Sequence, residues 1–441
     1  MIPRYTLPEM GRHWSELTKK QLWFEVEVAV LQAKEEFGLI PEWIADLARQ
    51  VTIDQAILDR ADELEKTSDH DLIAFILAVT EKLDNRVRPH FHTGLTSYDV
   101  EDTALAMQMK ESLGLLIFQL ARLQFALQHQ AQQYRQTVMI GRTHGIHAEP
   151  ITFGLRLLNW LDVIGRHSEQ LEAVKKTVAV GKISGAVGAF VLDPQVEEIA
   201  CRCLGLTAAR SSTQVISRDI HVKYVSVLVE VANSLDRFAI NIRRLAGTDF
   251  GEVAEYKKPG AKGSSAMPGK SRLRNPIKSE NVSALAKVMR GYLPMALECE
   301  LLWDERSLDN SAAERIFLPD TSILLDFMLQ RFTDTVEKLE VYPDQMVANL
   351  RKTGGIVFAQ RVMMALTETG MERKLAYDFV ESIALTVAPG TFVDSEGRNF
   401  EQLVREHPEI TNRLSSAQLN ECFDPKQSLK HVDAIYARFG L

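Results

Sequence analysis

The apolar positions of the chain recur at the spacing of long α-helices. Two runs alternate steps of three and four residues, which places apolar side chains on one face of a helix. The runs are Leu113, Leu116, Leu120, Leu123 and Leu127, and then Leu228, Val231, Leu235, Phe238, Ile242 and Leu245. We therefore expect two long, packed helices.

Three further stretches have helical spacing, at about 153–176, 282–302 and 321–339. Glycine and proline are scarce in these regions, which favours a central bundle built from five long helices. Several of the helices carry apolar groups on more than one face. We therefore expect them to pack against other copies of the chain in a homo-oligomer.

The regions on either side of the bundle also follow helical patterns. A smaller helical segment ends near His92, and Thr96 or Ser97 can cap the first long helix. The segment 342–344, Tyr-Pro-Asp, breaks the pattern after the bundle. The predicted fold is all-α, with three helical domains over 1–96, 97–342 and 343–441.

Composition narrows the class of protein. Of the 441 residues, 46% are hydrophobic and 25% are charged, which is typical of a soluble globular protein. The formal charge of -8 gives no support for nucleic-acid or membrane binding. The four cysteines form no plausible disulfide framework, and we see neither a signal peptide nor a membrane span. We expect a cytoplasmic protein.

Five of the eleven histidines, at positions 70, 90, 92, 144 and 147, fall close to turns and hydroxyl residues. His144, His147 and Glu149 offer zinc ligands, but the His-Glu-x-x-His pattern and a matched cysteine pair are missing, so we predict no metal site. General acid-base chemistry is the better functional interpretation. We expect His144 at a helix entry, where a purely structural, hydrogen-bonded role is the alternative.

The segment 263–276, Gly-Ser-Ser-Ala-Met-Pro-Gly-Lys-Ser-Arg-Leu-Arg-Asn-Pro, lies between two helical patterns. Its Gly-Lys-Ser run resembles a P-loop, but the required first glycine is replaced by Ser264 and no hydrophobic strand precedes it. We predict a catalytic lid over about 257–280, in which Lys270 and Asn275 bind an anion. The alternative is a surface hairpin between helices.

A second anion site is predicted near Arg306. Ser311 and Arg315 lie one helical turn apart, so exposed amides and a guanidinium can face the same phosphate. Ser311 with Glu314 also fits a capping box, so helix initiation is the alternative role.

Several motifs together resemble the aspartase/fumarase superfamily, and most closely its adenylosuccinate lyase family. They are Arg4-Tyr5, His70-Asp71, His92-x-Gly94-Leu95-Thr96-Ser97, Gly141-Arg142-Thr143-His144-Gly145, the segment 181–188, Ser212-Thr213-Gln214 and the segment 263–276. The resemblance implies a mostly helical, three-domain subunit in a homotetramer, with a common helical core and active sites shared between subunits. It also implies that neither a metal nor an organic cofactor is needed.

The activity implied by the resemblance is elimination of fumarate from a succinylated amine. The resemblance makes Ser264 the base and His144 the acid that protonates the departing nitrogen, with Glu280 orienting His144. It gives His70 a role at the phosphate or in proton transfer. The implied substrate-binding residues are Arg4, Tyr5, Arg306, Ser311 and Arg315 for the nucleotide and its phosphate, Lys270 and Asn275 for the succinyl carboxylates, Thr96, Ser97 and Gln214 for the succinyl end, and Asp71 and His92.

The loop departs from the family pattern in one respect. Gly269 replaces a large residue, and three residues separate Lys270 from Arg274-Asn275-Pro276. Either residues 271–273 bulge outward, or Arg272 or Arg274 takes the place of Lys270. A milder departure is Asp309-Asn310, where many bacterial relatives have histidine. Alternative functions are a paralogous carbon-nitrogen lyase acting on another succinyl or aspartyl amine, and a non-catalytic relative.

Overall fold

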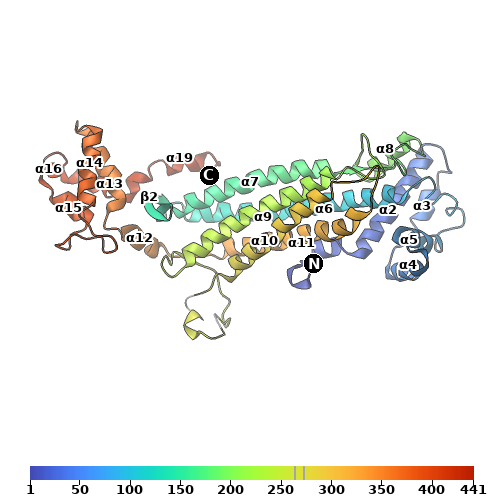
Figure 1. Cartoon of the computed structure of the whole chain (residues 1–441), viewed down its shortest axis with the longest axis horizontal. Coiled ribbons are helices and arrows are strands. Elements are labelled where there is room, and N and C mark those ends of the chain that lie inside the picture. The colour runs from blue at the N-terminus through green and yellow to red at the C-terminus, as the bar shows by residue number, and fades with distance from the viewer. Residues whose placement is uncertain (263–264, 272–273) are drawn as a thin grey trace. The chain divides into compact units, whose positions relative to one another are not determined.

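The computed structural model describes residues 1–262, 265–271 and 274–441 and is mostly helical, which confirms the all-α expectation (Figure 1). The chain divides into two compact units. Unit 1 comprises Met1–Leu123, Ile164–Arg237 and Asn281–Phe332, and unit 2 comprises Gln124–Val163, Phe238–Glu280 and Thr333–Leu441. The predicted boundaries of three domains stay a prediction.

The five predicted long helices are all present. They are α6 (Ser97–Gln133), α7 (Phe153–Val178), α9 (Asp219–Ala246), α10 (Ile277–Glu298) and α11 (Asp309–Glu337). All the side chains of the two predicted apolar runs are buried. Within unit 1, His167 of α7 contacts Ser234 of α9 at 2.8 Å, and Tyr224 of α9 contacts Ser322 of α11 at 2.6 Å. Hydrogen bonds thus accompany the apolar packing between these helices.

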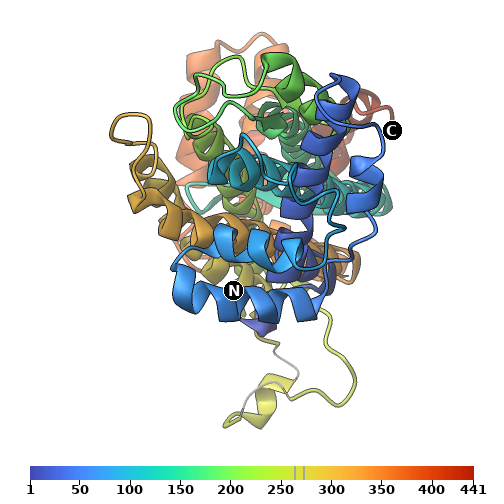
Figure 2. The same ribbon diagram turned by 90° about the vertical axis from the view of Figure 1, so that its right-hand side faces the viewer.

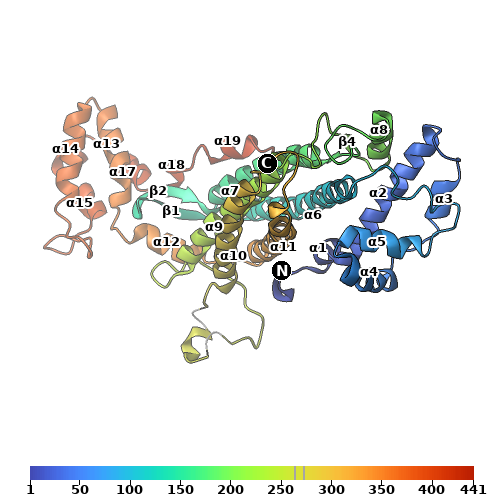
Figure 3. The same ribbon diagram turned by 45° about the vertical axis from the view of Figure 1, so that its right-hand side comes forward.

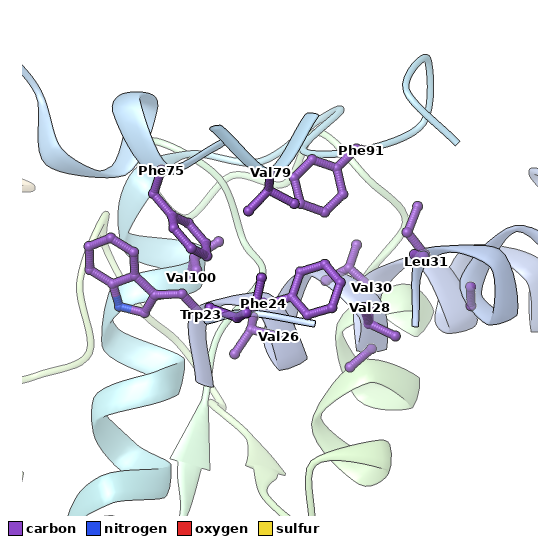
Figure 4. Close-up of a cluster of buried hydrophobic side chains, with 14 of the residues drawn as sticks. Trp23, Phe24, Val26, Val28, Val30, Leu31, Phe75, Val79, Phe91 and Val100 are labelled. Carbon is purple, nitrogen blue, oxygen red and sulfur yellow. The ribbon is translucent and has the colours of Figure 1, made fainter. Parts of the chain in front are cut away.

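Further helices, of which only α2 is long, form the rest of unit 1. They are η1 (Pro3–Tyr5), α1 (Pro8–His13), α2 (Glu16–Glu36), α3 (Ile44–Ala48), α4 (Gln55–Ser68), α5 (Asp71–Thr80) and α8 (Pro194–Cys203), with a parallel pair of two-residue strands, β3 (Val180–Gly181) and β4 (Thr207–Ala208). Figure 4 shows the core that α2 and α5 build against the start of α6. Trp23 and Phe75 meet there edge to face at 5.7 Å, a geometry that aromatic rings favour.

Unit 2 contains an antiparallel hairpin of β1 (Val138–Thr143) and β2 (Ile146–Thr152). The hairpin lies beside α12 (Pro343–Arg351) and α18 (Pro425–Ser428) (Figure 3). His144 and Gly145 form its turn with φ of 53° and 83°. The expectation that His144 lies at a helix entry is therefore wrong, because positive φ at both central residues is the geometry of a tight hairpin turn.

The remaining elements of unit 2 are short. They are β5 (Val253–Ala254) paired antiparallel with β6 (Glu340–Val341), η2 (Pro268–Ser271), η3 (Ile356–Phe358), α13 (Ala359–Glu368), α14 (Arg373–Ala384), α15 (Phe400–Glu406), α16 (Pro408–Thr411), α17 (Ser416–Cys422) and α19 (Val432–Ala437). The helix α12 begins at Pro343, as the break in the pattern predicts. Helices α13 to α17 share a separate apolar core around Phe400.

None of the helices in the described ranges is long and apolar enough to span a bilayer. Over the same ranges, His, Cys, Asp and Glu side chains do not gather in groups of three that could hold a metal ion.

Candidate functional site

The predicted site residues fall in both units. Unit 1 holds Arg4, Tyr5, His70, Asp71, His92, Thr96, Ser97, Gln214, Arg306, Ser311 and Arg315, and unit 2 holds His144, Lys270, Asn275 and Glu280. Ser264, the predicted base, lies outside the described residues, as do Arg272 and Leu273.

The start of α6 is fixed by a buried ion pair. Asp99 Oδ1 lies 2.5 Å from Lys182 Nζ, and neither side chain is exposed. Asp99 also accepts hydrogen bonds from the backbone amides of Thr96, at 2.8 Å, and Gly185, at 3.1 Å. These bonds compensate for burying the carboxylate. Asp99, which sequence reasoning missed, therefore holds Thr96 and Ser97 against the segment 181–188.

The same segment makes a close backbone contact at Gly188. Its φ is 78°, and a Cβ atom at this position would overlap the carbonyl oxygen of Ser212. Ser184 Oγ and Ser212 Oγ are 2.7 Å apart. The segment therefore lies directly against the residues that lead to Gln214, whose Nε2 donates to the carbonyl of Ala186 at 3.2 Å.

His70, Ser97, Asp71 and Arg315 come together in unit 1. His70 Nε2 lies 3.2 Å from Ser97 Oγ, and Arg315 Nη2 lies 2.8 Å from Asp71 Oδ2. Burial raises the pKa of Asp71, but Arg315 and Lys20 more than offset this, so its pKa is lowered overall. The structure thus brings Ser97 and Arg315 to the adjacent residues His70 and Asp71.

A cavity of about 110 Å³ in unit 1 is lined by Glu101, Ser311 and Arg315 among others. Arg315 Nη2 lies 3.5 Å from Glu101 Oε2. Burial first, and the nearby Asp71 carboxylate second, raise the pKa of Glu101 to about 7. The cavity therefore combines a guanidinium with a carboxyl group that changes charge near neutral pH.

Tyr98 lies between two of the predicted phosphate residues. Its hydroxyl is 3.0 Å from Ser311 Oγ, and the guanidinium carbon of Arg306 is 3.3 Å from the centre of its ring. Tyr98 is buried and was not predicted as a site residue. A tyrosine beside a helix cap carries no distinctive sequence signal.

A buried ion network includes Glu314, which lies three residues after Ser311 in the sequence. Arg218 binds Asp102 at 2.6 Å and Glu314 at 3.0 Å, and His221 Nδ1 lies 3.1 Å from Glu314. Burial raises the pKa of Glu314, but His221 and Arg218 outweigh it and lower the pKa to about 2. The capping-box interpretation is therefore wrong. Helix α11 begins at Asp309, and Glu314 turns toward Arg218 instead of the helix cap.

His92 is held by a buried carboxylate. Its Nδ1 is 2.6 Å from Glu27 Oε1, and the Glu27 side chain is only 1% exposed. His92 has a φ of 55°, outside the helical and extended regions. Glu27 therefore fixes the orientation of the ring and leaves Nε2 as its other hydrogen-bonding atom.

In unit 2, His144 is presented on the hairpin turn, and an ion pair holds the hairpin. Arg142 donates to both carboxylate oxygens of Glu252, at 3.1 and 2.7 Å. Asn349 of α12 donates to the same carboxylate at 2.8 Å. His144 itself is exposed at the tip of this turn. The His144 imidazole is therefore open to solvent.

The described parts of the predicted lid project away from the ends of α9 and α10 that they connect (Figures 1 and 2). Lys270 lies in η2, and Asn275 directly precedes α10. Arg274 is paired with Glu340 of β6. Glu255 accepts hydrogen bonds from the amides of Lys278 and Ser279, at 2.9 and 2.7 Å, which fixes the start of α10.

Comparison with known proteins decides the family. Residues 4–291 match the family described as lyase, and residues 355–439 match the adenylosuccinate lyase C-terminus. The chain is 47% identical to the adenylosuccinate lyase of Synechocystis sp. and 42% identical to that of Bacillus subtilis, over 100% of each chain. The chain belongs to the adenylosuccinate lyase family. The sequence resemblance and the expected carbon-nitrogen lyase class are confirmed.

Solved structures of related enzymes share the fold. A fumarate lyase from Mesorhizobium sp. BNC1 superimposes with a TM-score of 0.86 and 26% identity, covering 98% of both chains. A 3-carboxy-cis,cis-muconate lactonizing enzyme from Pseudomonas putida also gives 0.86, with 28% identity over 98% of this chain and 96% of that one. The fold of this chain is thus shared with enzymes that are named for other reactions.

Proposed function

We propose that the chain catalyses the elimination of fumarate from adenylosuccinate, which yields AMP, and from the corresponding succinyl-aminoimidazole carboxamide ribonucleotide. The observation that carries the proposal is that Arg306 and Ser311 both contact Tyr98, while Ser311 and Arg315 line one cavity of unit 1. Their arrangement suits a phosphate monoester, because guanidinium groups and a hydroxyl supply several directed donors. The full-length identity to two adenylosuccinate lyases supports the same substrate.

The chemistry divides into proton removal and protonation. Ser264 takes the proton next to a succinyl carboxylate, and Lys270 and Asn275 stabilise the charge that develops on that carboxylate. His144 protonates the departing nitrogen, with Glu280 as its orienting partner. Thr96, Ser97 and Gln214 position the succinyl end. Neither a metal nor an organic cofactor takes part in this scheme.

The homotetramer and the cytoplasmic location belong to the same proposal. Phe118 of α6 is 65% exposed, Ile240 of α9 is 51% exposed and Ile316 of α11 is 57% exposed. Large apolar side chains on long helices favour burial against other copies of the chain. Active sites assembled from several subunits then bring Glu280 of one copy to His144 of another.

The test is fumarate release by the purified protein from each of the two nucleotides, followed by absorbance and chromatography. Ser264→Ala is expected to lower kcat by roughly 10²–10⁴-fold, the usual range for a lost general base. Ser265→Ala removes the neighbouring hydroxyl and is the matched control, with a much smaller expected loss. A wild-type protein that never forms AMP and fumarate refutes the proposal.

The departure of the loop from the family pattern favours one alternative, a lyase acting on another succinyl or aspartyl amine. An assay of fumarate release from a panel of such amines distinguishes this alternative from the proposed adenylosuccinate reaction. Turnover of purine nucleotides alone excludes the alternative. If Ser264→Ala leaves turnover unchanged, the assigned base is wrong, and a protein without any lyase activity points to a non-catalytic relative.

A further inference from the structure

We propose that Tyr98 is a positioning residue that holds Arg306 and Ser311 in the geometry that binds the phosphate of the nucleotide. The inference rests on the proposed function and adds a residue that the family motifs do not include. Tyr98 occupies the second position of α6, directly after Ser97.

Tyr98 makes two different contacts, one through the face of its ring and one through its hydroxyl. The face of the ring lies 3.3 Å from the guanidinium carbon of Arg306, and the hydroxyl lies 3.0 Å from Ser311 Oγ. The side chain is only 8% exposed, so the ring has little freedom to move. One residue therefore sets the positions of both a cation and a hydroxyl.

The stacking leaves the hydrogen-bond donors of Arg306 available. An aromatic face attracts a guanidinium through its quadrupole and takes up none of its N–H groups. Both terminal nitrogens of Arg306 are buried, and neither has a hydrogen-bond partner in the described part of the chain. Two such nitrogens can donate in parallel to one phosphate.

Arg315 provides an internal comparison. Its Nη2 atom lies 2.8 Å from Asp71 and 3.5 Å from Glu101, so its charge is partly compensated by carboxylates. A carboxylate in the place of Tyr98 would do the same to Arg306 and would repel a phosphate. An aromatic ring holds the cation without neutralising it. Arg306 is therefore the stronger of the two phosphate ligands.

The phenol also orients Ser311. Burial raises the pKa of Tyr98, so the hydroxyl keeps its proton across the physiological range. A protonated phenol can donate to Ser311 Oγ, which directs the Ser311 O–H toward another acceptor. A phosphate oxygen is such an acceptor, so this hydrogen bond prepares Ser311 as a donor to the ligand.

The experiment tests binding of the nucleotide end and of the succinyl end of the substrate separately, by using the products AMP and fumarate as inhibitors. Inhibition constants for AMP and for fumarate are measured with full-length wild type, Tyr98→Leu and Tyr98→Phe. Tyr98→Leu is expected to weaken AMP by about 10-fold or more, because it loses the stacking and the hydrogen bond. Tyr98→Phe keeps the ring and is expected to weaken AMP by about 3–5-fold. Fumarate inhibition is expected to change less than about twofold in both, since fumarate has no phosphate.

Tyr224→Phe is the matched control. Tyr224 also makes a buried tyrosine-serine hydrogen bond, 2.6 Å to Ser322, which involves neither Arg306 nor Ser311. Its removal is expected to leave AMP inhibition unchanged. If Tyr98→Leu does not fold, as judged by its melting curve, Tyr98→Phe alone decides the question.

Two results overturn the inference. One is an AMP inhibition constant that is unchanged in the folded variants, and the other is an equal weakening of AMP and fumarate, which marks a merely structural role. Both require an active wild type, so they differ from failure of the proposed function, in which the wild type releases no fumarate. A selective loss of AMP inhibition supports the inference.

Discussion

Lys182 and Asp99 form an ion pair of 2.5 Å in which neither side chain reaches solvent. The pair joins the segment 181–188 to the start of α6, where Thr96 and Ser97 lie. A charge that is buried with a partner becomes costly as soon as the partner is removed. The local architecture of the candidate site thus depends on a charge balance that takes no direct part in the chemistry.

Lys182→Met is therefore expected to destabilise the protein by about 3–5 kcal/mol, because Asp99 is left as an uncompensated buried carboxylate. Urea unfolding measures the change. The double variant Lys182→Met with Asp99→Leu buries no charge and is expected to recover part of the loss. A double variant whose loss equals the sum of the two single losses would mean that the pair contributes no coupling energy.

Glu101→Gln is expected to raise the stability of the protein at pH 8 relative to wild type. Burial raises the pKa of Glu101 to about 7 in the folded state, from its ordinary value of 4.5. A carboxyl group whose pKa is higher in the folded state than in the unfolded state stabilises the folded protein fully below about pH 4.5. This contribution is lost as the pH rises through about 7. Glutamine stays neutral, so the free energy of unfolding of Glu101→Gln is expected to exceed that of wild type by a margin that grows over this pH range to roughly 2–3 kcal/mol.

Urea unfolding of wild type and Glu101→Gln at pH 5, 6, 7 and 8 measures this difference. Other groups that titrate in the same range, such as Asp326, affect both proteins equally and cancel in the comparison. Parallel stability curves for the two proteins would contradict a raised pKa at Glu101.

Gly145→Ala is expected to cost about 1–2 kcal/mol and to lower the rate of fumarate release. Gly145 has a φ of 83°, which an L residue with a side chain adopts only with strain. The added methyl group would also lie 3.1 Å from Arg244 Nη2. Because His144 is the other central residue of this turn, a distorted turn moves the predicted proton donor.

Gly291→Ala is the control for that substitution. Gly291 lies inside α10, and an added methyl group there meets no atom within 4 Å. Alanine is the better helix former, so this variant is expected to gain about 0.5–1 kcal/mol. Thermal melting measures both changes, and equal effects of the two substitutions would argue against strain at the turn.

Deletion of residues 271–273 is expected to preserve or improve lyase activity. Arg274 is already paired with Glu340, so the end of the loop is fixed independently of the three extra residues. The deletion restores the family spacing between Lys270 and Asn275. A steady-state assay of fumarate release measures the effect, and complete loss of activity would mean that the extra residues have acquired a function.

The long helices and the family motifs could be predicted from the sequence because their signals are local. The run from Leu113 to Leu127 specifies one face of α6 without reference to the rest of the chain. The roles of charged residues could not be predicted in this way. Ser311 and Glu314 fit a capping box, yet Glu314 pairs with Arg218, 96 residues away. A local pattern cannot exclude a stronger distant partner.

The position of His144 illustrates a second limit. Its flanking glycine is compatible with both a helix entry and a hairpin turn, and only the pairing of Arg142 with His147 on the opposite strand selects the hairpin. Tyr98 was missed for a related reason. A buried tyrosine is common, and its role becomes visible only when Arg306 and Ser311 are brought to it from more than 200 positions later in the chain.

At Gly188 the backbone contact leaves room for a hydrogen atom and nothing larger. The identity of this residue is therefore set by geometry, regardless of which substrate the enzyme uses. A larger side chain at position 188 would push the segment 181–188 away from Ser212. Because Ala186 of that segment accepts a hydrogen bond from Gln214, the displacement would reach the predicted succinyl-binding residue without any change to the ligand itself.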